Sequence, residues 1–250
     1  MKNIKIFGIA LLLMVLIGSI SGCIQITVNT TSDESSAPSI SNTPEKQEST
    51  SSETGENATS ELPHTVPNGY TIPDTNMTIS VPEDAVVLSV DTPADDAAWS
   101  KAGILDASEK IKEMQKNGTT AEIIAANGDT IAVAAKSSDY ANSVFNLNNL
   151  DEKGKKDFLK YMEPSSMDGS TTGTITWYDH AQIPFFMIDI CAENIKEEGP
   201  VYERLYGTLY DGKIVSFDLF GDTKKISEET DAFMRAVVDS AVISAFAENP

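Results

Sequence analysis

The sequence predicts an α+β domain in which an antiparallel sheet built of hairpins is layered with about three helices. Two hairpin signals support the sheet, because apolar stretches flank tight turns at Asn127-Gly128 and Asp211-Gly212. Three stretches with apolar residues at helical spacing support the helices. Hairpins that alternate with helices along a chain are typical of a layered α+β sandwich.

The strongest hairpin signal covers residues 201–221 and turns at Asp211-Gly212. A two-residue turn fixes the register of the strands and places Tyr206 opposite Phe217. Apolar residues then lie on both faces, so we expect this hairpin in the centre of the sheet, covered on each side. One face would carry Tyr206, Thr208, Val215, Phe217 and Leu219, and the other Leu205, Leu209 and Ile214.

Further strands are predicted before this hairpin in the chain. Residues 77–90 read as two short strands broken at Val81–Asp84, where a proline cannot donate to a strand ladder. Residues 121–137 form another hairpin, for which Asn127-Gly128 predicts a type I′ turn with positive φ at both positions. Residues 173–193 are predicted as two strands around Asp179–Gln182.

The first predicted helix lies within residues 103–118. Asp106 and Glu109 have the spacing of a capping pair at its start. Gly118 is the residue type that ends a helix in the left-handed conformation.

Two more helices are predicted towards the C-terminus. The first covers residues 149–162, with Asn149 placed to cap it. The second begins near Ser227, which is a good N-cap residue. Its buried stripe would consist of apolar residues at four-residue spacing, namely Phe233, Val237, Ala241 and Ala245.

The first 22 residues have the layout of a secretory signal peptide, with basic, then apolar, then small residues. The apolar run Ile6–Ile17 is shorter than the ~20 residues of a comfortable membrane span. Ile20–Cys23 resembles the lipobox of exported lipoproteins, in which the cysteine sulfur carries diacylglycerol. The alternative is a plain membrane anchor with an incidental cysteine. Either way we expect the chain at the cell membrane, facing outside the cytoplasm, and the lipobox predicts membrane lipid as a partner through acylated Cys23.

A tether is predicted between this anchor and the folded domain. Residues 23–67 are rich in Ser, Thr, Glu and Pro and carry few apolar side chains, so they are expected to be disordered. The globular domain then covers residues 68–250. N-glycosylation sequons begin at Asn29, Asn57, Asn76 and Asn117.

Charge and cysteine content narrow the partners of the chain. The formal net charge is −20, which makes nucleic acid an unsuitable partner, because phosphate binding needs a basic patch. A weak attraction for divalent cations is an alternative meaning of this charge, although no compact calcium-type loop is present. Once Cys23 is lipidated, Cys191 is the only thiol, and its apolar neighbours predict a buried structural role.

The candidate catalytic residue is His180, which Asp179 beside it would orient. Neighbouring residues on a strand point to opposite faces, which works against direct pairing of the two. The chain has no nucleophile elbow, Walker loop or dinucleotide fingerprint, and one thiol with one domain histidine is a thin zinc ligand set. We therefore predict no catalytic, cofactor-binding or metal-binding residue. The alternative is an extracytoplasmic hydrolase that uses carboxylates, with or without His180.

The order of several stretches resembles the PsbP/Mog1-like fold, in particular uncharacterised PsbP-related lipoproteins of bacteria and archaea. The stretches are residues 70–93, 121–137, 202–222 and 232–243. The last contains Val238–Ala241, which resembles the "hDSh" stretch in the final helix of that family. The resemblance implies an α-β-α sandwich and a non-enzymatic, accessory role. Its relatives of known role, an extrinsic photosystem subunit and a small nuclear-transport factor, transfer no specific function. We expect a binding or accessory domain that contacts another cell-envelope protein or an extracellular ligand.

Overall fold

The computed structural model describes residues 68–163, 171–192, 200–223 and 225–243. All of these belong to one compact unit. The predicted signal peptide, the lipidation residue Cys23 and the tether lie outside the described residues. So do the sequons at Asn29 and Asn57, and Ala245 of the predicted helix stripe.

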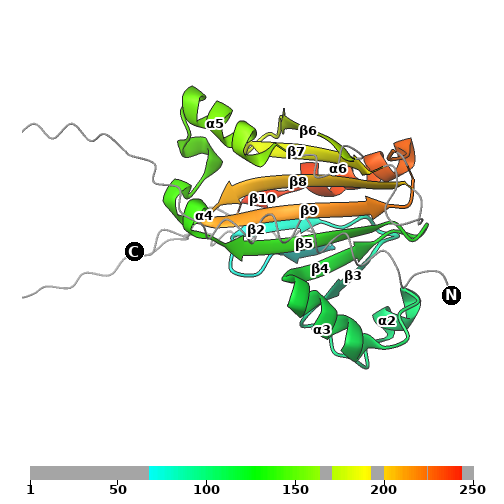
Figure 1. Ribbon diagram of the computed structural model, residues 1–250. Helices are drawn as coiled ribbons and strands as arrows, with labels where there is room; N and C mark the ends of the chain where they lie inside the picture. Colours follow the sequence, from blue (N-terminus) through cyan, green and yellow to red (C-terminus); the bar gives the residue numbers. More distant parts are fainter. Residues whose placement is uncertain (1–67, 164–170, 193–199, 224, 244–250) are drawn as a thin grey trace, which may run out of the picture. The chain divides into compact units, whose positions relative to one another are not determined.

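A seven-stranded antiparallel sheet forms the centre of the domain (Figure 1). The strands run across it in the order β3-β4-β5-β9-β8-β7-β6, so the strongest predicted hairpin, β8–β9, is central. The α+β class and the antiparallel sheet built of hairpins are therefore confirmed. The strands are β3 (Val86–Ser89), β4 (Thr119–Ile124), β5 (Thr130–Ser137), β6 (Thr171–Tyr178), β7 (Phe185–Ala192), β8 (Val201–Tyr210) and β9 (Lys213–Gly221).

A smaller sheet in the order β1-β2-β10 contributes to a layer on one face of the large sheet. Its strands are β1 (Gly69–Thr71), β2 (Met77–Ser80) and β10 (Val242–Ile243). The two strands predicted in residues 77–90 both exist, but β2 joins the small sheet and β3 the large one. The chain changes sheet at the predicted break, where the Ala85 N–H donates to the Pro82 carbonyl at 3.0 Å.

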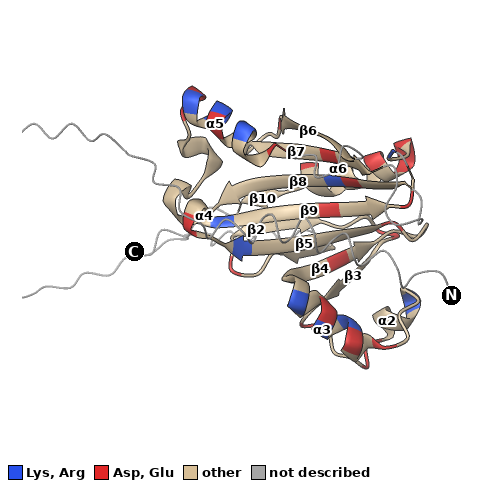
Figure 2. Ribbon diagram, in the orientation of Figure 1, with Lys and Arg blue, Asp and Glu red and all other residues tan. Residues whose placement is uncertain are grey.

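Helices cover both faces of the large sheet. Helix α6 (Glu228–Asp239) joins the small sheet on one face, while α2 (Ala97–Lys101) and α3 (Ala107–Asn117) pack near β3 and β4 on the other. At the opposite end of that face lie α4 (Asp139–Val144), the 3₁₀ helix η2 (Leu147–Asn149) and α5 (Glu152–Met162). Figure 2 shows that charged residues gather on α3 and α5, whereas the central strands carry few.

The three predicted helices are present as α3, α5 and α6, and the short helices α2 and α4 are additional. Asp106 is confirmed as the N-cap of α3, since its side chain accepts from the Glu109 N–H at 2.9 Å, which is one half of the predicted capping pair. Gly118 ends this helix with φ 68°. The short helices depend on local caps that periodicity does not show, with Asp96 capping α2 and Ser138 capping α4.

The predicted cap of α5 is wrong. The N-cap is Asp151, whose side chain accepts from the Gly154 N–H at 2.6 Å. Asn149 instead ends η2 and donates its amide to the Val144 carbonyl at 2.9 Å. The 3₁₀ turn takes up residues that the sequence pattern assigned to the start of the helix, so helix α5 begins later than predicted.

The buried stripe of α6 differs in part from the predicted one. The N-cap Ser227 is confirmed, but the helix ends at Asp239, so Ala241 is buried beyond its end. The fully buried positions of the helix are Met234, Val237 and Val238, while Phe233 is only partly buried. The helix stops because β10 follows it directly and pairs with β2.

The two hairpin turns differ from each other. The register of β8–β9 is confirmed, with Tyr206 opposite Phe217, and the positive φ values of Asp211 (52°) and Gly212 (69°) fit a type I′ turn. In the β4–β5 turn Gly128 has φ 92°, but Asn127 does not have positive φ, so type I′ is wrong there. The Asn127 side chain accepts from the Asp129 N–H at 3.0 Å and holds a longer loop.

The central hairpin is buried on both faces, as predicted. Tyr206, Val215 and Phe217 belong to the core shared with α6 and the small sheet. Leu205, Leu209 and Ile214 belong to a second core shared with α4 and α5. A third, smaller core lies under α2 and α3.

Candidate functional site

A pocket of about 460 Å³ lies where edge strand β6 turns into β7, next to the N-terminal end of α5. The 3₁₀ helix η2 closes another side of it. Its lining combines aromatic, ionisable and amide side chains, so it can offer both apolar contact and hydrogen bonds. The lining residues are Asn148, Glu152, Lys155, Trp177, Tyr178, Asp179, His180, Gln182, Ile183 and Pro184.

The Trp177 ring is held in place by an aromatic cluster. It stacks on Phe158 of α5, with ring centroids 5.9 Å apart and an interplanar angle of 22°. Phe158 is itself buried and meets Phe186 of β7 edge-on at 5.1 Å. Tyr140 of α4 also stacks on Phe158, with ring centroids 6.1 Å apart. The pocket therefore has an aromatic wall whose position is set by the packing of α4 and α5 on the sheet.

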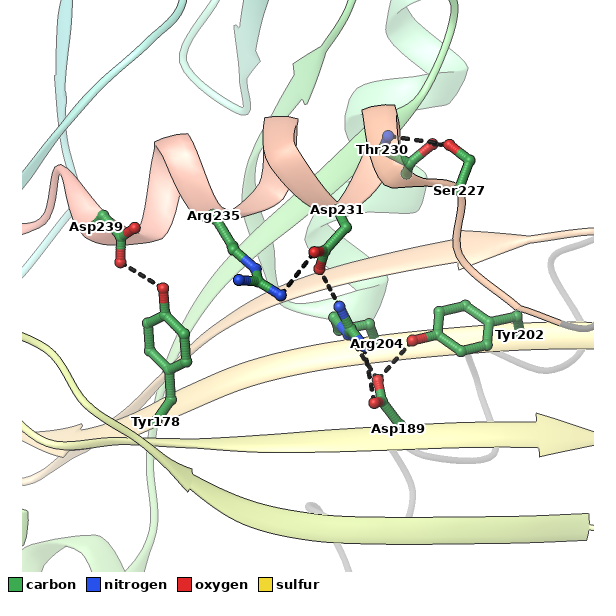
Figure 3. A network of polar contacts seen from close by, with 9 residues as sticks. All are labelled: Tyr178, Asp189, Tyr202, Arg204, Ser227, Thr230, Asp231, Arg235 and Asp239. Carbon is green, nitrogen blue, oxygen red and sulfur yellow. Dashed lines mark hydrogen bonds and ion pairs between the residues drawn. The ribbon is translucent and has the colours of Figure 1, made fainter.

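Tyr178 connects the pocket to the opposite face of the sheet (Figure 3). Its hydroxyl donates to Asp239 at 2.6 Å, and its ring meets Tyr206 edge-on at 4.7 Å. Burial raises the pKa of Tyr178 above its ordinary value, and the hydrogen bond to Asp239 raises it further. The phenol is therefore a fixed, neutral donor to the end of α6.

His180 has a structural role at one of its ring nitrogens. Nδ1 accepts from the backbone N–H groups of Gln182 at 3.2 Å and Ile183 at 3.4 Å. A neutral imidazole that accepts at Nδ1 carries its proton on Nε2. The Nε2 atom is buried without a hydrogen-bond partner in the described part of the chain. The ring also meets Phe185 edge-on at 5.2 Å.

The catalytic pairing considered for Asp179 and His180 is not formed. Both residues line the pocket, but Nδ1, the nitrogen that a carboxylate would orient, already faces two backbone donors. The residues that line the pocket include no Ser, Thr or Cys that could act as a nucleophile. The ring is therefore positioned by the turn itself rather than by Asp179.

The charged groups of the pocket leave a small negative excess. Glu152 and Asp179 supply two carboxylates, and Lys155 supplies one ammonium group. Lys155 Nζ lies 3.1 Å from Glu152 Oε1, so one carboxylate is already paired. Asp179 is exposed and forms no ion pair with another described residue. An anionic ligand is disfavoured by this balance.

A polar network fastens α6 to the sheet (Figure 3). Arg204 of β8 binds Asp189 of β7 through two bonds, Nε–Oδ1 at 2.6 Å and Nη2–Oδ2 at 2.8 Å, and it also contacts Asp231 of α6. Arg235 binds the other oxygen of Asp231 at 2.7 Å, and the Tyr202 hydroxyl donates to Asp189 at 2.6 Å. Two arginines balance two aspartates, so the network has no spare charge for a ligand.

The stretch behind the "hDSh" resemblance belongs to the same junction. Asp239 accepts from Tyr178, as described above. The Ser240 hydroxyl accepts from the Ser80 N–H of β2 at 2.8 Å and donates to the Val237 carbonyl at 2.6 Å. The Asp-Ser pair therefore links the end of α6 to both sheets, which is a structural role.

The free cysteine and two of the sequon asparagines lie within the described residues. Cys191 is free and only partly buried in β7, less than the buried structural role predicted. Asn76 lies in the bend before β2, and Asn117 is the last residue of α3; both are partly buried. The Asn117 carbonyl accepts from Lys136 Nζ at 2.7 Å, and Thr119 of its sequon is buried.

Within residues 68–243, apart from the short gaps, none of the helices has the length and hydrophobicity of a membrane span. In the same part of the chain, no three or more His, Cys, Asp or Glu side chains are grouped so that they could hold a metal ion.

Comparisons with known proteins give one kind of match. No family model and no curated protein matches the chain. The structure is similar to the solution structure of cyanobacterial PsbP (CyanoP) from Synechocystis sp. PCC 6803, at 11% sequence identity and a TM-score of 0.40, over 70% of this chain and 91% of that one. At a TM-score this low, the similarity supports no conclusion about the role of this chain.

Proposed function

We propose that this chain is a membrane-anchored, surface-exposed lipoprotein whose folded domain is a non-catalytic binding or accessory module. The observation that carries the binding role is the pocket beside β6, because its walls are fixed by contacts made elsewhere. Trp177 is stacked on Phe158, Tyr178 is bonded to Asp239, and His180 is bonded to its own turn. A preorganised site of this kind loses little conformational entropy on binding.

The pocket suits a small ligand that is uncharged or cationic and has both polar groups and an apolar face. The carboxylates of Glu152 and Asp179 accept hydrogen bonds, and the amides of Asn148 and Gln182 can donate or accept. Trp177 offers an aromatic surface for an apolar face or a quaternary ammonium group. The small negative excess opposes phosphate-like anions.

Nuclear magnetic resonance of the ¹⁵N-labelled mature protein tests this proposal. The chain has two tryptophans, so the indole region contains one signal from Trp99 and one from Trp177. The Trp177→Phe variant assigns them by loss of one signal. We expect saturable shifts of the Trp177 signal with a neutral monosaccharide or choline and none with inorganic phosphate. No response to either of the first two probes, or a response to phosphate, would contradict the proposal.

A matched pair of variants checks that such shifts come from the pocket. Glu152→Gln removes a carboxylate that lines the pocket and pairs with Lys155. Asp157→Asn removes a carboxylate of the same helix that pairs with Lys153 and does not line the pocket. Binding should weaken several-fold in the first variant and stay unchanged in the second. Equal effects would place the ligand elsewhere on the protein.

The membrane anchor is tested separately. Acyl chains contribute about 0.8 kcal/mol per buried CH₂, so a diacylated Cys23 with a further chain gives stable anchoring. Mass spectrometry of the processed protein should find a diacylglycerol adduct on Cys23, and the Cys23→Ser variant should keep its leader. An intact leader on the wild-type protein recovered from the cytosol would overturn the lipoprotein assignment. Pull-down from the membrane fraction then tests for a cell-envelope partner.

An extracytoplasmic hydrolase is the second candidate, favoured by one observation. Glu152, Asp179 and His180 all line one pocket, and carboxylate pairs can hydrolyse glycosides without a serine or cysteine nucleophile. Turnover of chromogenic glycosides that disappears in Asp179→Asn but persists in Asp157→Asn would favour this candidate. Binding without turnover favours the non-catalytic module.

A further inference from the structure

Two carboxyl side chains lie in the middle of the seven-stranded sheet, apart from the pocket and from the arginine network. Glu203 of β8 is 3% exposed and Asp218 of β9 is 4% exposed. Asp218 pairs directly with Leu205, and Glu203 pairs with Phe220. Glu203 and Asp218 are therefore diagonal neighbours on one face of the sheet, within reach of each other.

The positions beside this pair on the flanking strands are apolar. Ile190 of β7 lies opposite Glu203, and Ala132 of β5 lies opposite Asp218. Arg204, the cation nearest in sequence, follows Glu203 directly and so points to the opposite face. It is engaged there with Asp189 and Asp231.

On this face of the sheet the other described titratable residues are Glu122 and Lys136, and each has a partner of its own. Glu122 of β4 pairs with Ala132 of β5, so it lies two strands away from Asp218 of β9, and its carboxylate is 2.7 Å from Lys110 of α3. Lys110 also lies 3.7 Å from Glu113. Lys136 of β5 lies four residues from Ala132 on the same face and bonds the Asn117 carbonyl. Among the described residues, Asp218 is the charged neighbour that raises the pKa of Glu203, in addition to burial.

The oxygen atoms of the pair are incompletely bonded. Both carboxyl oxygens of Glu203 and Oδ1 of Asp218 are buried and have no hydrogen-bond partner by distance and angle among the described residues. Two ionised carboxylates in this setting would repel each other with no cation to compensate. Burial raises the pKa of both groups, and the nearby Asp218 raises that of Glu203 further. A shared proton would remove one charge and supply the missing donor.

We propose that Glu203 and Asp218 form a proton-binding pair that keeps at least one proton at neutral pH and couples the stability of the central sheet to pH. The folded chain holds this proton more tightly than the unfolded chain, in which both carboxyls ionise near pH 4. The unfolded state therefore binds fewer protons above that pH, and the free energy of unfolding falls as the pH rises. The stabilisation is present in acid and is lost as the pH passes through the raised values of the pair.

Urea unfolding of the mature protein from pH 5 to pH 9 tests the proposal. A one-proton difference changes the unfolding equilibrium constant about tenfold per pH unit. We expect the wild type to lose stability towards pH 9 with a slope of up to that size. Glu203→Gln should flatten the slope, because the amide stays neutral and can donate to Asp218. Glu83→Gln, at an exposed position between β2 and β3, should keep the wild-type slope.

An unchanged slope in Glu203→Gln would overturn the proposal. If that variant does not fold, infrared spectroscopy of the wild-type protein decides instead. A protonated carboxyl band should persist at pH 7 and disappear only at higher pH, because surface carboxyls are ionised by then. Absence of the band at pH 7 would show that both groups are ionised and that no proton is shared.

Discussion

Two consecutive residues of β8, Glu203 and Arg204, point to opposite faces of the large sheet, and their buried charged groups have different surroundings. Arg204, on the face of α6, is 11% exposed and bonds two aspartates from β7 and α6. Glu203, on the face of α4 and α5, is 3% exposed and has only another acid beside it. One face is joined to α6 by ion pairs, whereas the other is packed by shape, and its central acids Glu203 and Asp218 have no ion-pair partner among the described residues.

The difference explains how each layer is positioned. The bidentate bond between Arg204 and Asp189 fixes the guanidinium within the sheet, and its remaining contact with Asp231 then positions α6. On the other face the aromatic cluster around Phe158 and the small residue Gly207 set the packing. The pocket lies at the end of β6. There Trp177 packs on the face covered by α4 and α5, and Tyr178 reaches the face covered by α6.

Removal of Arg204 should have the largest effect. Arg204→Met leaves Asp189 and Asp231 partly buried without their shared cation, and breaking such a pair costs about 3 kcal/mol. The free energy of unfolding from urea titration measures this loss. Arg235→Met is the matched control, because that side chain is 52% exposed and its ion pair is worth about 0–1 kcal/mol. Similar losses in both variants would show that the network does not fasten α6.

Gly207 tests whether the other face is held by shape. A Cβ atom at this position would lie 2.3 Å from the ring of Phe186, so Gly207→Ala forces a packed ring to move and should cost about 1–3 kcal/mol. Gly221→Ala is the control, because its added Cβ would meet only Thr223 Oγ1 at 3.7 Å. Thermal unfolding of both variants makes the comparison. A tolerated Gly207→Ala would mean that this core is loosely packed.

The cap of α5 should have a smaller effect on the same face. Asp151→Ala removes the side chain that accepts from the Gly154 N–H, and the loss of such a cap costs about 1 kcal/mol. Asn149→Ala removes only an exposed amide bond to Val144 and should cost less. Urea unfolding of the two variants measures the difference. The reverse order would restore Asn149 as the functional cap.

Local sequence signals predicted the parts of the fold that local geometry decides. Asp211-Gly212 has the residues that a type I′ turn requires, so the register of β8–β9 and the division of its side chains between two cores followed directly. Asp106 and Gly118 likewise mark the start and the end of α3, as expected. These features depend on residues that are close together in the chain.

Errors arose where two local solutions compete. Asn149 and Asp151 are both good capping residues, and a 3₁₀ turn stabilised by contacts with α4 decided between them. Asn127-Gly128 resembles a type I′ turn, but the Asn127 side chain stabilises a longer loop by bonding Asp129. Sequence reasoning reached the candidate site only through His180 and Asp179, which follow Trp177 closely in the chain, and no sequence signal brought Glu152 to them.

The amino-acid sequence by itself determined the α+β class, the central hairpin with its register and the starts of two of the three main helices. It did so because turns and caps act over a few residues and because alternation assigns each strand residue to a face. Only the tertiary structure decided which strands share a sheet, which residues line the pocket, and that Arg204 finds carboxylates while Glu203 finds another acid. Those outcomes depend on contacts between residues far apart in the chain, where spacing carries no information about distance in space.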